Sequence, residues 1–260
     1  MPSDPPSASS LPFSDPAGEL LAAARFCVPD QVPGLVTAYA RRAGALDAGV
    51  YLIDYEQRVL TPLPRVDGPE RAPVAVEGTL AGRAFSTLDQ QWSGDAGILW
   101  IPMVEGNERL GVVGYELGGP ARPGQVDQLN RLTVTVAELV AAKSAYGEFF
   151  EQHRRLVPMS IASELAWQLL PPLTFGCRNL VISGILAPAY DLGGDSFDYG
   201  VDSAQARVAV FDAMGHGLEA GMLVTVAVAA YRNSRRRGLK LDETAAAIDE
   251  AVSARFGPER

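Results

Sequence analysis

Two short acidic motifs in the C-terminal third of the chain have the residue types that metal-assisted chemistry requires. Asp195 stands in the run GGDSFD, directly after Gly193 and Gly194, and Asp212 follows the apolar run 208–211 and opens the run DAMGHG. A carboxylate at the end of a strand emerges at a fixed place, and glycines let the backbone approach an ion closely. Carboxylate and carbonyl oxygens are the ligands that hard divalent cations prefer. Two such ions, about 3.5–4 Å apart, activate water for phosphoester hydrolysis without a nucleophilic side chain.

Other polar residues near these motifs have more than one interpretation. We expect Asp198 to cap or buttress the first motif rather than to bind metal. His216 is either a general acid or a residue that orders the GHG loop, and we favour the second role. The basic run 232–237 lies at the end of a helical stretch. It either places favourable charge at a helix C-terminus or contacts an acidic or phosphorylated partner.

The elements that position these motifs follow from hydrophobic periodicity. Residues 161–170 have the apolar face of a helix, which Pro171 and Pro172 end. Beyond them the patterns predict two strands and two helices, over 180–186, 207–211, 218–236 and 241–256. Asp195 is expected in a glycine-bearing turn between the two strands.

The patterns in the N-terminal half of the chain predict helices, then strands, then a helix. Apolar spacing predicts helices over 18–28 and from Pro33 to Gly44. The period then changes to that of strands, expected over 49–55, 59–63, 74–76, 98–104 and 109–117, with helical turns at 79–85. The polar stretch 105–108 between the last two strands is a strong hairpin signal.

A long helical stretch over residues 124–152 joins the two halves. Its apolar positions recur at alternating spacings of three and four, as in a heptad seam. The seam positions are Leu129, Leu132, Val136, Leu139, Lys143, Tyr146 and Phe150. Either the seam forms a parallel homodimer, in which Lys143 sets the register, or the helix packs on its own domain.

Composition narrows the class of protein. The 260 residues carry a formal net charge of −9, which argues against binding to nucleic acid or to anionic membranes. Hydrophobic residues make up 47%, so wholesale disorder is excluded. No run approaches the ~20 apolar residues of a membrane span, and the proline-broken N-terminus is unlike a signal peptide. Cys27 and Cys177 are isolated, as expected of free thiols in a cytoplasmic protein.

Three segments of the first half carry a family resemblance: VYLIDYEQRVLTPLP, VEGTLAGRAFST and ILWIPMVEGNERLGVVGYEL, in that order. Together they resemble a GAF domain, a small sensory module, over roughly residues 18–145. Trp92, Trp100 and Tyr55 either line a ligand pocket or belong to the core, and we favour the core. The first histidine is His153, beyond this region, so a haem ligand from within it is not available. We expect a structural or dimerising GAF domain without a ligand.

The second half contains WQLLPPL, APAYDLGGDSFDYGVD and VAVFDAMGHGLEAGMLVTVAVAAYRN in order. These segments resemble the SpoIIE/RsbU-type phosphatases, a bacterial branch of the PPM (PP2C-like) serine/threonine phosphatases. The resemblance implies that Asp212 bridges two Mn²⁺ or Mg²⁺ ions, that Ala213 lends a backbone carbonyl and that Asp195 lies near the same ions. It also implies a phosphorylated anti-anti-sigma (STAS) regulator as the substrate.

The resemblance covers only the first part of the PPM fold, which runs about twice as far and adds two metal-binding aspartates. We therefore expect an incomplete catalytic domain that is at most a poor metal binder. The expected fold is α+β: a GAF-like mixed sheet with flanking helices, a helical linker and a partial PPM α/β sandwich. The predicted parts are a disordered tail over 1–16 and the GAF-like domain over 17–123. The linker follows over 124–170, and the partial phosphatase domain over 171–260. The rival hypothesis is a non-enzymatic GAF dimer that keeps a remnant phosphatase lobe as a scaffold.

Overall fold

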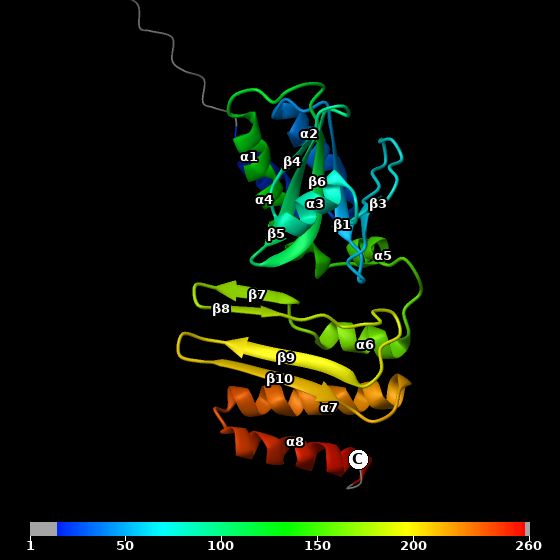
Figure 1. The fold of residues 1–260 in the computed structure, drawn as a ribbon, viewed down its shortest axis with the longest axis vertical. Helices are drawn as coiled ribbons and strands as arrows, with labels where there is room; N and C mark the ends of the chain where they lie inside the picture. Colours follow the sequence, from blue (N-terminus) through cyan, green and yellow to red (C-terminus); the bar gives the residue numbers. More distant parts are fainter. Residues whose placement is uncertain (1–14, 258–260) are drawn as a thin grey trace, which may run out of the picture. The chain divides into compact units, whose positions relative to one another are not determined.

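The computed structural model describes residues 15–257, which divide into two compact units (Figure 1). The first unit contains residues 15–52, Leu60–Glu105 and Leu110–Glu151, and the second contains Ile53–Val59, Gly106–Arg109 and residues 152–257. Both units combine helices with antiparallel strand pairs, which confirms the α+β class. Most of the predicted disordered tail lies outside the described residues, and Pro16 already begins the first helix.

A six-stranded sheet, in the order β3-β2-β1-β6-β5-β4, forms the middle of the first unit. Its strands are β1 (Asp47–Ile53), β2 (Val59–Pro62), β3 (Val74–Ala75), β4 (Gln91–Ser93), β5 (Ile98–Glu105) and β6 (Glu108–Glu116). The central strands β1 and β6 are antiparallel, with Val50 opposite Val113. Alternate residues of β1 are buried on opposite faces: Val50 enters the main core, and Tyr51 packs edge-on against Trp100.

Helices α1 (Pro16–Ala23), α2 (Val32–Arg42) and α4 (Gln125–Ser144) pack against one another beside this sheet. The short helices η1 (Ala24–Phe26) and η2 (Pro29–Gln31) join α1 to α2, and α3 (Leu80–Thr87) packs on β5. Gly44 follows α2 with φ +84°, a left-handed conformation that suits glycine after a helix. The core joins side chains of the sheet and of the three longer helices, among them Val36, Val50, Met103 and Leu132.

The heptad seam lies inside the first unit. Leu129, Leu132, Val136 and Leu139 are all buried in its core, which is the second of the two alternatives that the spacing allowed. Lys143 has another role, because its Nζ donates hydrogen bonds to the carbonyl oxygens of Cys27, at 2.8 Å, and Arg25, at 3.3 Å. The helix ends at Ser144 instead of near residue 152, and a separate short helix, α5 (Phe149–Arg154), follows.

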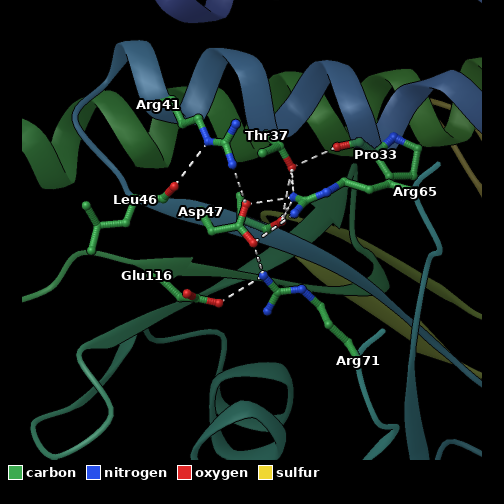
Figure 2. Close-up of polar contacts among 9 residues, drawn as sticks. Pro33, Thr37, Arg41, Leu46, Asp47, Arg65, Arg71 and Glu116 are labelled. Atoms are coloured by element: carbon green, nitrogen blue, oxygen red, sulfur yellow. Dashed lines mark hydrogen bonds and ion pairs between the residues drawn. The ribbon is translucent and has the colours of Figure 1, made fainter. Parts of the chain in front are cut away.

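A buried ion cluster ties α2, β1, β6 and the loop after β2 together (Figure 2). The Asp47 carboxylate accepts hydrogen bonds from both terminal nitrogens of Arg65, at 2.7 and 3.0 Å, and from one terminal nitrogen of Arg71. The same Arg71 nitrogen donates to Glu116 at 2.9 Å, and Arg65 also donates to the Thr37 hydroxyl at 2.6 Å. Burial alone raises the pKa of the Asp47 carboxyl, but the hydrogen bonds and charges of Arg65 and then Arg71 outweigh burial and hold this pKa below 3.8.

The second unit is built on two hairpins and three longer helices. Its elements are α6 (Ile161–Leu169), β7 (Thr174–Cys177), β8 (Leu180–Ser183), β9 (Asp195–Val201), β10 (Ala206–Asp212), α7 (Gly217–Arg236) and α8 (Leu241–Phe256). β7 pairs with β8 and β9 with β10, both antiparallel. α7 packs against α6, α8 and the β9–β10 hairpin. The rings of Phe211 and Tyr231 meet edge-on there, with their centres 5.7 Å apart.

The structure also corrects the strands predicted from the sequence. Residues 91–93, 174–177 and 195–201 are strands where the patterns indicated none, and the strand predicted over 180–186 ends at Ser183. The stretch 195–201 contains two aspartates and a glycine, which are rare in strands, and it is a strand because β10 pairs with all seven of its residues. In the described part of the chain, no helix combines the length and the apolar character that crossing a membrane requires.

Candidate metal centre

The register of the β9–β10 hairpin places Asp195 directly opposite Asp212. Asp195 is the first residue of β9 and Asp212 is the last residue of β10, so both lie at the same end of the hairpin. Residues directly opposite in an antiparallel pair point to the same face, with Cβ atoms about 4.5–5.5 Å apart. Both residues are solvent-exposed. Two carboxylates on one face at this spacing can share a cation, which would also relieve their repulsion.

The backbone of Ala213 continues this site. Its N–H donates to the Gly194 carbonyl oxygen at 3.0 Å, so the pairing continues between the residue after β10 and the residue before β9. A Cβ atom on Gly194 would lie 2.2 Å from the Ala213 carbonyl oxygen. Glycine at position 194 is therefore what allows the Ala213 carbonyl oxygen to lie this close to the backbone just before Asp195.

Gly194→Ala is expected to displace the Ala213 carbonyl and to weaken divalent-cation binding by about tenfold or more. Gly193→Ala is the matched control, because a Cβ atom there meets nothing closer than the Gly215 carbonyl oxygen at 3.8 Å, an ordinary contact. A Mn²⁺ titration of both variants and the unaltered chain, followed by electron paramagnetic resonance, measures the difference. Equal affinities in the two variants would contradict this role of Gly194.

Glycines also shape the loop between Asp212 and α7. Gly215 and Gly217 have φ values of +95° and +72°, in the left-handed region that other residues rarely adopt. His216 lies between them as the residue before the first turn of α7, and its side chain makes no capping hydrogen bond. Its imidazole is exposed at the same end of the hairpin as Asp212. The two roles considered for His216 from the sequence both remain predictions.

The loop that leads into Asp195 is held by α6. Ser160 caps this helix, and its N–H donates to the Tyr190 carbonyl oxygen at 3.1 Å. The Ser163 hydroxyl accepts from the Leu192 N–H at 2.6 Å, and the Trp167 indole N–H donates to the Ala189 carbonyl oxygen at 2.8 Å. These bonds fix the loop backbone within three residues of Asp195. The segment WQLLPPL thus holds the acidic motif through Trp167, a link that the sequence did not indicate.

Asp198 holds β9 against α7. Its side chain is 2% exposed, and its two oxygens accept hydrogen bonds from Arg232 at 2.8 Å and from Arg235 at 2.9 Å. Arg232 also donates to the Leu169 carbonyl oxygen, at the end of α6. Two residues of the basic run are therefore partners of a buried carboxylate, an arrangement that neither interpretation of the run included. The spacing of three between the arginines, which puts both on one helix face, was the available signal.

The donor set fits a hard divalent cation. Two carboxylates and one backbone carbonyl supply oxygen ligands of the kind that Mg²⁺ and Mn²⁺ take, with no sulfur or nitrogen donor of the kind that favours zinc. Among residues 15–257, no three His, Cys, Asp or Glu side chains gather into a metal-binding group. The candidate centre remains the one predicted from the sequence, namely Asp195, Asp212 and the Ala213 carbonyl.

Comparison with known proteins gives one family match. The model of the family "Stage II sporulation protein E (SpoIIE)" matches residues 202–260, which include β10, Asp212, Ala213, α7 and α8. This match confirms the SpoIIE resemblance of the C-terminal segment; Asp195 lies just outside it. No curated protein matches the sequence.

Several solved structures share features with the first half of the chain. The GAF domain of phosphoenolpyruvate-protein phosphotransferase from Acinetobacter is 11% identical, with a TM-score of 0.42, covering 51% of this chain and 95% of its own. The second GAF domain of DevS from Mycobacterium smegmatis is 20% identical, with a TM-score of 0.39, covering 45% and 96%. Both are GAF domains, the class of module that the first half resembles in sequence.

Proposed function

We propose that the second unit is part of the catalytic domain of a metal-dependent serine/threonine phosphatase of the SpoIIE type. The observation that carries this proposal is the placement of Asp195 directly opposite Asp212 in the β9–β10 hairpin. The family match over residues 202–260 supports it independently. The reaction is the hydrolysis of phosphoserine or phosphothreonine on a protein, with Mn²⁺ or Mg²⁺ as cofactor.

The chain's own residues would hold the cation and keep the site in shape. Asp195 and Asp212 supply carboxylate oxygens and Ala213 supplies its carbonyl oxygen. Divalent cations in such a site activate water and neutralise phosphate charge. Asp198 holds β9, whose first residue is Asp195, against the last turns of α7 through Arg232 and Arg235.

The substrate and the regulation form the finer part of the proposal. A phosphorylated STAS-type regulator is the substrate that the SpoIIE resemblance implies, which would place the protein in sigma-factor control. The first unit, which resembles a GAF domain in sequence, would act as the sensory part. The SpoIIE resemblance also implies that a complete site of this family has metal-binding aspartates in addition to Asp195 and Asp212.

Asp212→Asn is expected to weaken Mn²⁺ binding by about tenfold or more, because an amide oxygen replaces a charged ligand. Asp202→Asn is the matched control: Asp202 lies at the opposite end of the same hairpin, and its Oδ1 accepts from the N–H groups of Ala204 and Gln205, as an amide oxygen also can. The measurement is a Mn²⁺ titration by electron paramagnetic resonance, with hydrolysis of p-nitrophenyl phosphate as a second readout.

A loss of binding in Asp212→Asn alone supports the proposal. Equal Mn²⁺ affinity in the unaltered chain and in both variants would overturn it and favour the scaffold hypothesis, in which the second unit serves only as a docking surface.

A further inference from the structure

The turn between β1 and β2 belongs to the second unit, which includes Ile53–Val59. Tyr55 lies in this turn and is 7% exposed. Its ring packs edge-on against the Trp167 ring of α6, with the two centres 4.5 Å apart, and meets the Tyr190 ring edge-on at 6.2 Å. Trp167 and Tyr190 both take part in the hydrogen bonds that hold the loop before Asp195. A side chain from outside that loop therefore supports its anchors.

The turn itself keeps Tyr55 in a fixed place. Asp54, the residue before it, is fully buried, and its two carboxylate oxygens accept hydrogen bonds from three backbone N–H groups of the turn, at 2.7–3.1 Å. These donors belong to Glu56, Arg58 and Val59. The Arg154 guanidinium lies over the Tyr55 ring, 4.7 Å from its centre, and its Nε donates to the Ile53 carbonyl oxygen at 3.0 Å. Backbone and ring are therefore both held.

Trp167 connects this support to both sides of Asp195. Its ring packs against a small apolar cluster that includes Leu192, and Phe197 of β9 packs against the same cluster. Leu192 comes three residues before Asp195, and Phe197 comes two residues after it. The buried members of this cluster are Ala166, Leu186 and Leu192. In so small a cluster, the loss of an aromatic neighbour at one edge is felt throughout, because close packing transmits the change.

Tyr190 gives the loop a second link to the turn. Its hydroxyl oxygen accepts from the Leu156 N–H at 3.1 Å, and its carbonyl oxygen accepts from the Ser160 N–H at 3.1 Å. The planes of the Tyr55 and Tyr190 rings are inclined at 76°, the edge-to-face arrangement that aromatic pairs favour. Removal of the Tyr55 ring would thus take an edge contact away from both aromatic anchors of the loop at once.

We infer that Tyr55 is a positioning residue for the candidate metal centre. Through the two aromatic anchors, its ring keeps the loop in the conformation that sets Asp195 opposite Asp212. Tyr55 supplies no ligand itself, and it lies well before residues 202–260, so the family match does not account for its role. The effect on the metal rests on the proposed function, whereas the effect on the loop does not.

Tyr55→Ala is expected to speed amide hydrogen exchange at Leu192 and Ala213 by about tenfold, because both N–H groups bond to atoms that hold the loop. It is also expected to raise the dissociation constant for Mn²⁺ by about threefold or more, measured by electron paramagnetic resonance. Tyr55→Phe keeps the ring and is expected to behave as the unaltered chain in both measurements. Circular dichroism checks folding, and Tyr55→Leu, which keeps apolar volume, replaces Tyr55→Ala if the latter is unfolded.

Tyr51→Ala is the matched control. Tyr51 lies in β1 just before the turn, is 4% exposed and packs edge-on against Trp100 at 5.3 Å, within the first unit. Its truncation removes the same kind of ring contact from a different core. Both the Mn²⁺ affinity and the exchange at the two amides are therefore expected to match the unaltered chain.

Two results overturn the inference: unchanged exchange at Leu192 and Ala213 in Tyr55→Ala, or an equal change in Tyr51→Ala. Asp212→Asn separates this failure from a failure of the proposed function. If Asp212→Asn loses Mn²⁺ affinity and Tyr55→Ala does not, the proposed function stands and the role of Tyr55 at the metal centre is wrong. If Asp212→Asn binds Mn²⁺ as the unaltered chain does, the proposed function fails, and exchange at the two amides alone decides whether Tyr55 holds the loop.

Discussion

Asp47→Ala is expected to lower the free energy of unfolding of the first unit by about 3–5 kcal/mol. The carboxylate is the common partner of Arg65 and Arg71, whose side chains are themselves mostly buried. Its removal leaves the Arg65 guanidinium without an ionic partner in a place that water reaches poorly. Arg71 keeps Glu116, so the loss centres on Arg65 and on the Thr37 hydroxyl that bonds to it.

Native-state hydrogen exchange can measure this effect for the first unit separately, through the amides of β1 and α2. Glu138→Ala is the matched control, since it removes an exposed carboxylate from α4 and is expected to change stability by less than about 0.5 kcal/mol. Protection factors in Asp47→Ala that match those of the control would show that the cluster contributes little to stability.

The same carboxyl group predicts a direction of pH dependence. Its pKa is lower in the folded state than its ordinary 3.8, so its contribution to stability is fully present above pH 4. The contribution is lost as the pH falls from about 4 through the lowered pKa. The unaltered first unit should therefore lose stability below pH 4 more steeply than Asp47→Ala does.

Asp198→Ala is expected to destabilise the second unit by a similar amount, about 3–5 kcal/mol. Asp198 is more deeply buried than Asp47, and without it Arg232 and Arg235 face each other's charge on one side of α7. The Arg232 bond to the Leu169 carbonyl oxygen does not neutralise either charge. Hydrogen exchange in β9 and α7 reports the change, with Glu250→Ala on the exposed face of α8 as the control.

A triple variant separates burial of charge from loss of packing. Replacing Asp198 with Leu and both arginines with Met removes all three charges together and keeps apolar volume. Such replacements of buried ionic groups are often neutral or stabilising. Recovery of most of the stability in the triple variant is therefore expected, and a triple variant as unstable as Asp198→Ala would mean that the ion cluster itself is required.

Local patterns were sufficient where a segment's own residues decide its structure. The hairpin predicted over 98–117 and the helices predicted over 218–236 and 241–256 match β5–β6, α7 and α8 to within a few residues. Each has a clear period, and the two helices are followed by Gly238 and Gly257, whose positive φ values suit the end of a helix. The strands β4, β7 and β9 have no such period. They are strands because each pairs with a neighbouring strand, and local composition does not show that partner.

The same distinction between local sequence and strand pairing applies to the candidate site. The motif around Asp212 was sufficient to place that carboxylate at the end of a strand, and the family resemblance assigned Asp195 to the same ions. Only the register of β9 on β10 puts the two carboxylates opposite each other, and only the clash that a Cβ atom would make explains Gly194. A slip of one residue in the pairing would turn Asp195 to the other face.

The sequence by itself determined the α+β class, most of the helices and the acidic motifs, because periodicity and glycine spacing are written in consecutive residues. The tertiary structure alone decided what covers each face. It buried the Leu129–Leu139 stripe of α4 in its own unit, paired Asp198 with Arg232 and Arg235, and packed Tyr55 against Trp167. A helical or strand period shows which side of an element is apolar, but the partner of that side comes from residues far away in the chain, and only packing brings them together.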